Sequence, residues 1–237
     1  MSKGPRLVDC GTTTYRGGGG QLIGSRPLSA QRVIEAPKIN QYNRVIWVRS
    51  FGVLSPFNDH HDMLAYIFDN DGSDQRLPHV TEPPLPVSEA ELKELGVLYW
   101  RADGPEVVES VAKERGYKNR DTINVSRAGL GDLYESKIKG FFEEHMHEDE
   151  EIRYILDGTG YFDVRRTRDE AWVRIAVEKG DLLVIPAGIY HRFTLDTNDY
   201  IKALRLFQDE PKWVPHNRSP LTDENLHRKS YLQTINV

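Results

Sequence analysis

The sequence has a single cysteine, Cys10, and no apolar run close to the ~20 residues that a membrane-spanning helix needs. One thiol cannot form a disulfide within the chain, and it cannot supply a zinc-finger or iron–sulfur site that uses several thiolates. The net charge is −5, which argues against nucleic acid as the main partner. We therefore expect a cytoplasmic protein in a reducing compartment, with no secretory signal and no membrane span.

Composition is otherwise that of an ordinary globular chain. The 237 residues are 38% hydrophobic and 28% charged, and this length can bury a sizeable core. The charge is unevenly spread. Residues 1–62 hold eight Lys and Arg against four Asp and Glu, a local +4 that leaves −9 for the rest. We expect a basic extension attached to an acidic body.

Residues 1–62 are predicted to form a low-complexity basic extension that is disordered. Four consecutive glycines occupy positions 17–20, and glycine runs have high backbone entropy. The first strong apolar run, Val45-Ile46-Trp47-Val48, has no clear partner strand. The composition partly resembles an organellar transit peptide, although a tail, or translated sequence upstream of a start at Met63, is the favoured interpretation. We expect the functional domain to span residues 63–237.

Short helices are predicted in the first half of that domain, after a strand at Leu64–Phe68. Ser88 and Glu91 form a capping box, which predicts a helix that begins after Ser88 and ends at Gly96. A second helix is predicted from about Pro105 to Arg115. A third is predicted around Leu133–Lys139, ending at Gly140.

After Gly140 the pattern becomes that of β-structure. Strand-like runs occur at Tyr161–Val164, Trp172–Val177, Leu182–Ile185, His191–Leu195 and Tyr200–Phe207. Turns are predicted at Asp157-Gly158, Lys179-Gly180-Asp181 and Asp196–Asp199. Many short strands at this spacing predict an antiparallel sandwich or barrel, so the fold class is mainly β.

The stretch with the clearest chemistry runs from Glu143 to Tyr154. Alternate side chains of a strand share a face, so His145 and His147 point the same way, and Glu151 and Arg153 rejoin that face if the strand continues. Two imidazoles and a carboxylate suit a divalent transition metal. Alternation along the strand does not by itself select the acidic ligand, because residues 143 and 149 are also acidic and lie on the same face as Glu151.

A second histidine-bearing stretch strengthens this interpretation. Gly180 opens a run that passes through Pro186-Ala187-Gly188 and ends at His191. The Pro-x-Gly turn redirects the chain, and His191 begins the next predicted strand. Considered alone, His191 would be more typical of a core or surface histidine. The His-x-His pair, considered alone, would be more typical of a solvated strand edge.

These two stretches resemble the two motifs of the cupin superfamily. The spacings of His145, His147, Glu151 and Gly158 match the first motif, and those of Gly180, Pro186, Gly188 and His191 match the second. Two positions depart from the pattern. Four residues instead of five separate Gly140 from His145, and Leu195 stands where asparagine is expected; neither supplies a ligand.

The resemblance is more specific to the acireductone dioxygenase family. It is carried by the runs Glu151–Arg165, Pro186–Phe193 and Leu95–Trp100, and by Arg205-Leu206-Phe207 followed by Glu210-Pro211-x-Trp213. It extends from about residue 63 to about residue 220. It implies a single cupin-type antiparallel β-barrel, or jelly roll, with a few short helices N-terminal to the metal motif.

The resemblance also implies a metal site and a reaction. The implied ligands are His145, His147, Glu151 and His191, which would hold one Fe(II) or Ni(II) ion per chain. The substrates would be O2 and acireductone, 1,2-dihydroxy-3-keto-5-methylthiopentene, in methionine salvage. The Fe(II) form would give 2-keto-4-methylthiobutyrate and formate. The Ni(II) form would give methylthiopropionate, formate and carbon monoxide.

Four further residues are candidates around this site. Arg153 shares the ligand face and can offset substrate charge, or it forms a surface salt bridge. Arg205 lies in a buried-looking strand, where an anion-facing role and a structural ion pair are equally plausible. Phe193 and Trp213 are candidate walls of the substrate pocket, although aromatic residues at such places are more often core.

Other functions compete with the dioxygenase. Another cupin chemistry, such as an isomerase or a thiol dioxygenase, would use the same ligands, but general cupins do not share the run around Glu151–Arg165. A non-catalytic ligand-binding module is the alternative outside enzymes. We expect a monomer that is cytoplasmic, with nuclear presence as a further expectation and organellar targeting by residues 1–62 as a minor alternative.

Overall fold

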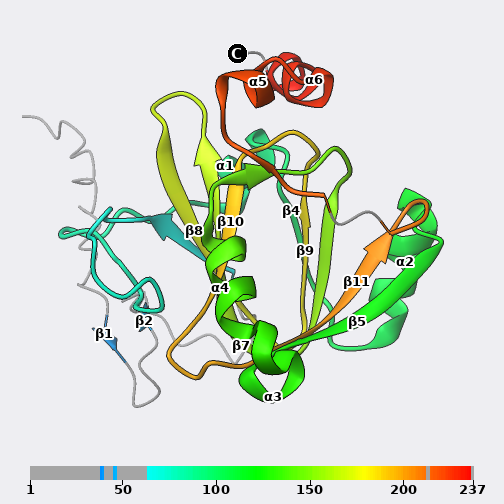
Figure 1. Ribbon diagram of the computed structural model, residues 1–237, viewed down its shortest axis with the longest axis horizontal. Coiled ribbons are helices and arrows are strands. Elements are labelled where there is room, and N and C mark those ends of the chain that lie inside the picture. The colour runs from blue at the N-terminus through cyan, green and yellow to red at the C-terminus, as the bar shows by residue number, and fades with distance from the viewer. Residues whose placement is uncertain (1–37, 40–44, 47–62, 212–213, 236–237) are drawn as a thin grey trace, which may run out of the picture. The chain divides into compact units, whose positions relative to one another are not determined.

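The computed structural model describes residues 38–39, 45–46, 63–211 and 214–235, which all belong to one compact unit, Ile34–Val237 (Figure 1). The strands are β1 Lys38–Ile39, β2 Val45–Ile46, β3 Leu64–Ile67, β4 Leu98–Arg101, β5 Asn119–Val125, β6 His145–Met146, β7 Glu151–Arg166, β8 Ala171–Glu178, β9 Asp181–Ile185, β10 His191–Leu195, β11 Ile201–Phe207 and β12 His216–Asn217. The helices are α1 Glu89–Glu94, α2 Pro105–Arg115, α3 Arg127–Leu130, the 3-10 turn η1 Gly131–Leu133, α4 Tyr134–Phe142, α5 Pro220–Asp223 and α6 Leu226–Thr234.

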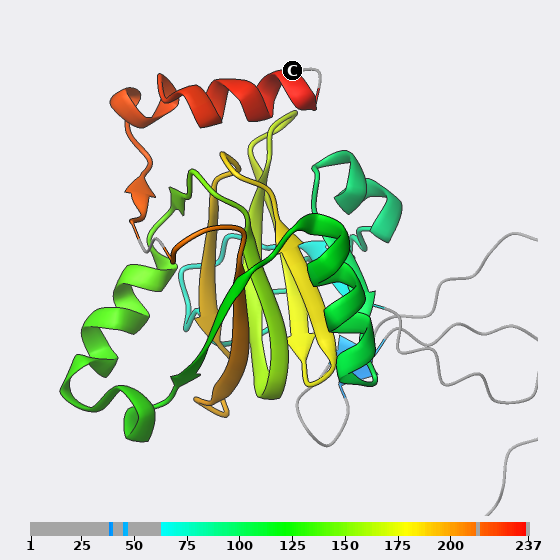
Figure 2. The ribbon, with the colours of Figure 1, turned by 90° about the vertical axis from the view of Figure 1, so that its right-hand side faces the viewer.

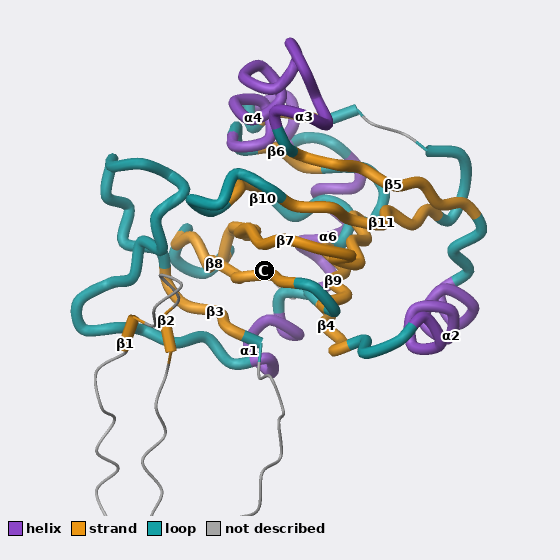
Figure 3. Tube along the Cα trace, turned by 90° about the horizontal axis from the view of Figure 1, so that it is seen from below, coloured by secondary structure: helices purple, strands orange, loops and turns teal. Residues whose placement is uncertain are grey.

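Ten of these strands form one antiparallel sheet that is folded on itself along β7. One face has the order β12-β6-β10-β7-β8-β3, and the other has the order β5-β11-β7-β9-β4. Figure 3 shows β6, β10, β8 and β3 on one side of β7, and β5, β11, β9 and β4 on the other. The prediction of a mainly antiparallel β-fold of jelly-roll type with a few short helices is confirmed; the described strands leave the barrel open.

The predicted turn at Asp157-Gly158 is wrong, because β7 continues through it. Gly158 has φ +77°, and a Cβ there would overlap the carbonyl oxygen of Tyr200. The register between β7 and β11 shifts at Lys202 and Ala203, opposite this point. A glycine and a bulge thus bend one long strand from the first face to the second, where the sequence pattern suggested a break between two strands.

Two apolar clusters hold the folded sheet together. The larger fills the space between the two faces and contains fully buried residues such as Val164, Ile175 and Leu183. The smaller lies under α2, whose Val108 and Val111 pack on residues that include Ile152 of β7. Alternate residues of β7 therefore face opposite clusters. The side chains of Glu151 and Arg153 point away from α2, toward the interior between the faces.

The predicted helices were found close to their expected positions. The capping box at Ser88 and Glu91 is present in full, and the second helix has the predicted bounds. The third runs from Tyr134 to Phe142 and so continues past Gly140. Strands β4 and β5 and the helices α5 and α6 were not predicted. No helix among the described residues is long and apolar enough to cross a membrane.

The run that begins at Val45 has a partner that was missed. Val45–Ile46 pairs antiparallel with Lys38–Ile39, with Lys38 opposite Ile46. Strands of two residues are too short to produce a periodic hydrophobic pattern, so this pairing could not be predicted from the sequence. The remainder of the predicted extension lies outside the described residues, and the boundary at residue 63 stays a prediction.

Candidate metal centre

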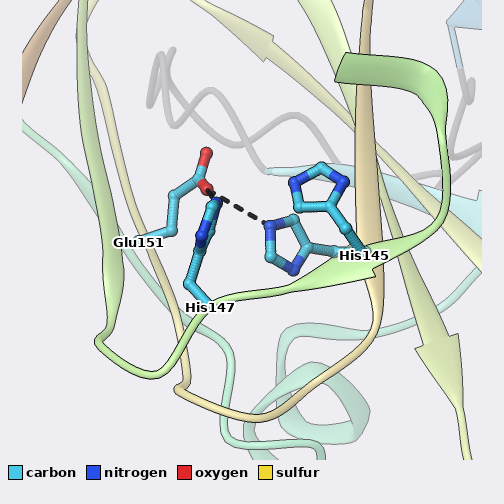
Figure 4. A group of neighbouring side chains, drawn as sticks. His145, His147 and Glu151 are labelled. Atoms are coloured by element: carbon cyan, nitrogen blue, oxygen red, sulfur yellow. Dashed lines mark hydrogen bonds and ion pairs between the residues drawn. The ribbon is translucent and has the colours of Figure 1, made fainter. Parts of the chain in front are cut away.

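Strands β6, β7 and β10 bring together the side chains of three histidines and one glutamate. His145 begins β6 and stands directly opposite His191, the first residue of β10. His147 follows β6, and Glu151 opens β7. One ligand atom from each of the four lies within 4.8 Å of the others. Figure 4 shows the side chains of His145, His147 and Glu151 turned toward one another.

Backbone carbonyls fix the orientation of all three imidazoles. The Nδ1 atoms of His145, His147 and His191 lie 2.6, 3.0 and 3.0 Å from the carbonyl oxygens of Glu143, Val214 and Ile189. A carbonyl can only accept, so in the neutral ring each Nδ1 carries the proton and donates it. Each Nε2 is thereby left with a lone pair, and metal-binding histidines are commonly oriented in this way.

The electrostatics of the cluster favour a neutral imidazole at His145 and an ionised carboxylate at Glu151. Burial, together with the charge of His191, lowers the pKa of His145 to about 4. Burial alone would raise the pKa of Glu151, but the positive charge of Arg153 and, when their rings are protonated, the hydrogen bonds from His147 and His191 hold it well below its usual range. The Glu151 carboxylate is therefore charged at neutral pH, which is the state a ligand requires.

The donor set fits a divalent metal ion. The Nε2 atoms of His147 and His191 each lie 3.2 Å from Oε2 of Glu151, so lone pairs converge on a small volume. The side chains of His145, Glu151 and His191 are nine-tenths buried or more. Several acceptors brought together in this way repel one another unless a cation or protons lie between them. Three imidazoles and one carboxylate are ligands for iron, nickel or similar ions.

The structure also selects among the acidic residues near the histidines, of which strand parity left those at 143 and 149 open beside Glu151. Glu143 accepts a hydrogen bond from Asn217, 2.9 Å away, and Glu144 is paired with Arg165 and Arg218. Glu150 contacts Arg115, and it accepts a hydrogen bond from Tyr117. Among the described residues, Glu151 is the acid that lies with the three histidines.

The two arginines proposed for catalysis are neighbours on β7 and β11. Arg153 and Arg205 stand opposite each other in the sheet register, so their side chains share a face. Nη2 of Arg153 lies 3.0 Å from Oε1 of Glu151, so this arginine contacts the cluster directly. Arg205 forms a two-pronged ion pair with Asp121 of β5, at 2.6 and 2.7 Å. The structural ion pair expected as one alternative for Arg205 is therefore present.

The aromatic candidates are less directly placed. The ring of Phe193 packs against Phe162 and Phe141, with centroids 4.9 and 6.2 Å away, and so forms part of the core. Trp213 lies outside the described residues. A cavity of about 580 Å³ is lined by residues that include Gly158 of β7 and Tyr200, and by none of the four clustered side chains.

Sequence reasoning missed the residues that support the histidines from outside. Val214 supplies its carbonyl oxygen to His147, and Arg165 and Arg218 bind Glu144 next to His145. A carbonyl partner has no signature in a sequence, because any residue type can provide it. The two arginines are visible in the sequence, but their partners depend on the fold.

The fold and the cluster together define a cupin-type protein with a metal centre of three histidines and one glutamate. The model of the ARD/ARD' family matches residues 64–215, and the chain belongs to this family. Acireductone dioxygenase 1 of Coprinopsis cinerea is 64% identical over 179 residues, which cover 74% of this chain and 99% of that protein. Acireductone dioxygenase of Tuber melanosporum is 57% identical over 173 residues, or 73% and 98% of the two chains.

A solved structure is similar in fold. Acireductone dioxygenase from Bacillus anthracis, with a cadmium ion in its active centre, superposes with a TM-score of 0.52 at 23% identity. The match covers 65% of this chain and 98% of that one. At this identity the likeness supports the fold alone, and it agrees with the jelly-roll topology described above.

Proposed function

We propose that this chain is an acireductone dioxygenase of methionine salvage. The observation that carries the proposal is the cluster of His145, His147, Glu151 and His191 in a chain 64% identical to a protein of that name over 99% of its length. The reaction adds both atoms of O2 to 1,2-dihydroxy-3-keto-5-methylthiopentene and cleaves its carbon chain. The products are 2-keto-4-methylthiobutyrate and formate, or methylthiopropionate, formate and carbon monoxide.

The bound ion would supply open coordination positions for the two enediol oxygens and would favour their deprotonation. The side chains of the protein would bind the ion and balance the charge of the substrate. The buried carboxylate of Glu151 and the three Nε2 atoms would hold the ion, and burial keeps the site poor in bulk water. Arg153 is largely buried beside Glu151, where its guanidinium offsets the negative charge of the substrate.

The metal is proposed to be Fe(II) or Ni(II), one ion per chain. The donor set suits both ions, because imidazole and carboxylate bind either of them. Affinity order favours Ni(II), while availability in cells favours iron. We propose that the ion loaded determines which of the two product sets is formed.

The remaining roles are also proposals. Arg205 faces the same side as Arg153 and would act on substrate charge while Asp121 holds it in place. Phe193 and Trp213 would wall the pocket around the methylthio group. We further propose that the enzyme is a monomer of the cytoplasm, with the nucleus as a second location.

The test is metal-dependent consumption of acireductone. The chain is stripped of metal, reloaded with Fe(II) or Ni(II), and mixed with acireductone in air-saturated buffer while substrate absorbance is followed. Glu151→Gln keeps the size of the side chain and removes its charge, and Glu109→Gln at the exposed surface is the matched control. We expect turnover in the wild type and the control, and loss in Glu151→Gln. A loaded wild type no faster than metal-free buffer would refute the proposal.

A further inference from the structure

The C-terminal segment, residues 214–234, passes both metal-binding stretches although the family model ends at residue 215. Figures 1 and 2 show α5 and α6 lying across one end of the strands. Each stretch that carries a histidine of the cluster is contacted by this segment. The contacts described below leave the three Nε2 atoms and the Glu151 carboxylate free to face the cluster. The segment therefore supports the centre from outside.

The first histidine stretch is held by β12. Asn217 stands opposite His145, and His216 stands opposite Met146, in an antiparallel pair. The backbone N–H of Arg218 donates to the carbonyl of Glu144 at 2.9 Å, and its Nη1 donates to the Glu144 carboxylate at 2.9 Å. The carbonyl of Val214, just before β12, accepts from Nδ1 of His147.

The turn before His191 is held by α6. Arg228 is 5% exposed, and its Nη1 donates to the carbonyl oxygen of Gly188 at 3.1 Å. Its guanidinium lies over the ring of Tyr190, 4.4 Å from the centroid. The hydroxyl of Tyr190 in turn donates to Asp223 of α5 at 2.7 Å. One buried arginine thus contacts both the carbonyl of the Pro-x-Gly turn and the residue that precedes a histidine of the cluster.

Gly188 joins the two histidine stretches. Its N–H donates to the carbonyl of His147 at 2.9 Å, while its own carbonyl accepts from Arg228. Its φ is +81°, and a Cβ there would overlap the carbonyl oxygen of His227. Gly188 is therefore packed directly against α6. A shift of this turn would move the backbone of His147 and of His191 together.

We propose that Arg228 is a positioning residue of the metal centre. Through Gly188 it sets the separation between the backbone of His147 and the strand that carries His191, and so fixes the distance between two Nε2 atoms. Burying a guanidinium is costly unless it is well paired, and here its partners are the turn carbonyl and an aromatic ring. The inference rests on the metal centre of the proposed function and does not depend on acireductone as substrate.

The test compares Arg228→Met with Lys229→Met in the full chain. Both changes remove one positive charge from α6, but Lys229 is half exposed and pairs with Glu224 at the surface. Ni(II) affinity is measured by competition with a chelator, and folding is checked by circular dichroism. We expect Kd to rise roughly 10- to 100-fold in Arg228→Met, which is typical when an outer-shell partner is lost. We expect less than a twofold change in Lys229→Met.

Two further measurements separate positioning from a general loss of stability. The visible absorption of bound Co(II) reports ligand geometry, and we expect it to change in Arg228→Met but not in Lys229→Met. Arg228→Lys retains a donor and a cation, so we expect its Kd to lie between those of wild type and Arg228→Met. If Arg228→Met does not fold, Arg228→Lys serves in its place, with the same comparison to Lys229→Met.

The outcomes are distinct. An unchanged Kd and an unchanged Co(II) spectrum in a folded Arg228 variant would overturn the positioning role and leave the proposed function untouched. A wild type that binds neither Ni(II) nor Co(II) would overturn both proposals. A wild type that binds metal but does not consume acireductone would overturn the proposed function alone.

Discussion

Replacing Arg153 with Met tests how this chain handles the charge of its substrate. The side chain keeps its bulk but loses a buried cation 3.0 Å from Glu151. A hydrogen bond to a charged partner contributes about 1.5–3 kcal/mol, and 1.36 kcal/mol corresponds to a factor of ten. The expected fall in kcat/KM is therefore about 10- to 150-fold, at a metal content near one ion per chain.

The same change has a second expected effect at low pH. Burial raises the pKa of Glu151, and the positive charge of Arg153 is the largest of the effects that lower it. Without Arg153 the pKa of Glu151 rises, so protons compete with the metal at higher pH. Acid release of Ni(II) should therefore begin at a higher pH in Arg153→Met than in the wild type.

The assay follows acireductone decay at saturating O2 and measures metal per chain on the same samples. Lys202→Met is the matched control, because Lys202 is an exposed cation on the strand next to β7. Full kcat/KM with full metal in Arg153→Met would refute a role for this arginine in substrate binding. Loss of metal in proportion to activity at neutral pH would show that Arg153 acts by bracing Glu151 alone.

Three other predictions follow from the fold and the site. Ala in place of any one of the four clustered residues (His145, His147, Glu151 and His191) should abolish turnover and most metal binding while far-UV circular dichroism is retained; full activity in one variant would remove that residue from the centre. Arg174→Met breaks a buried pair with Asp163, so the melting temperature should fall by about 6 °C or more, as read by calorimetry; a change below about 2 °C would contradict a strong buried pair. A chain that starts at Met63 retains every clustered residue and should keep its metal content and turnover; an inactive or insoluble product would place part of residues 1–62 in the functional domain.

The chemistry of the candidate site was readable from the sequence because it depends on local spacing. His145 and His147 alternate along one stretch, and a turn places His191 at the start of the next strand. The pattern can therefore be recognised without knowledge of the fold. The choice of Glu151 was not readable from parity. It depends on where β7 begins and on the partners, such as Asn217, that engage the neighbouring acids.

The fold was readable only in part, and the errors have physical causes. An Asp-Gly pair usually marks a turn, but Asp157-Gly158 lies where a long strand bends from one face of the sheet to the other. Tertiary packing decides whether such a pair forms a turn or a bend within a strand. Strand β5 reads Asn-Arg-Asp-Thr-Ile-Asn-Val, which is too polar to suggest a strand, because one of its faces is exposed. Helix α6 was missed because its apolar residues are few and its buried Arg228 binds a backbone carbonyl.

The most direct test of the central proposal is product analysis with a defined metal. The purified chain is stripped, loaded with Fe(II) or Ni(II), and supplied with acireductone and ¹⁸O2, and the acids and gas are then identified by mass. We predict labelled 2-keto-4-methylthiobutyrate and formate from the Fe(II) form, and labelled methylthiopropionate and formate with carbon monoxide from the Ni(II) form. Products without ¹⁸O, or equal rates with and without metal, would contradict a metal-dependent acireductone dioxygenase.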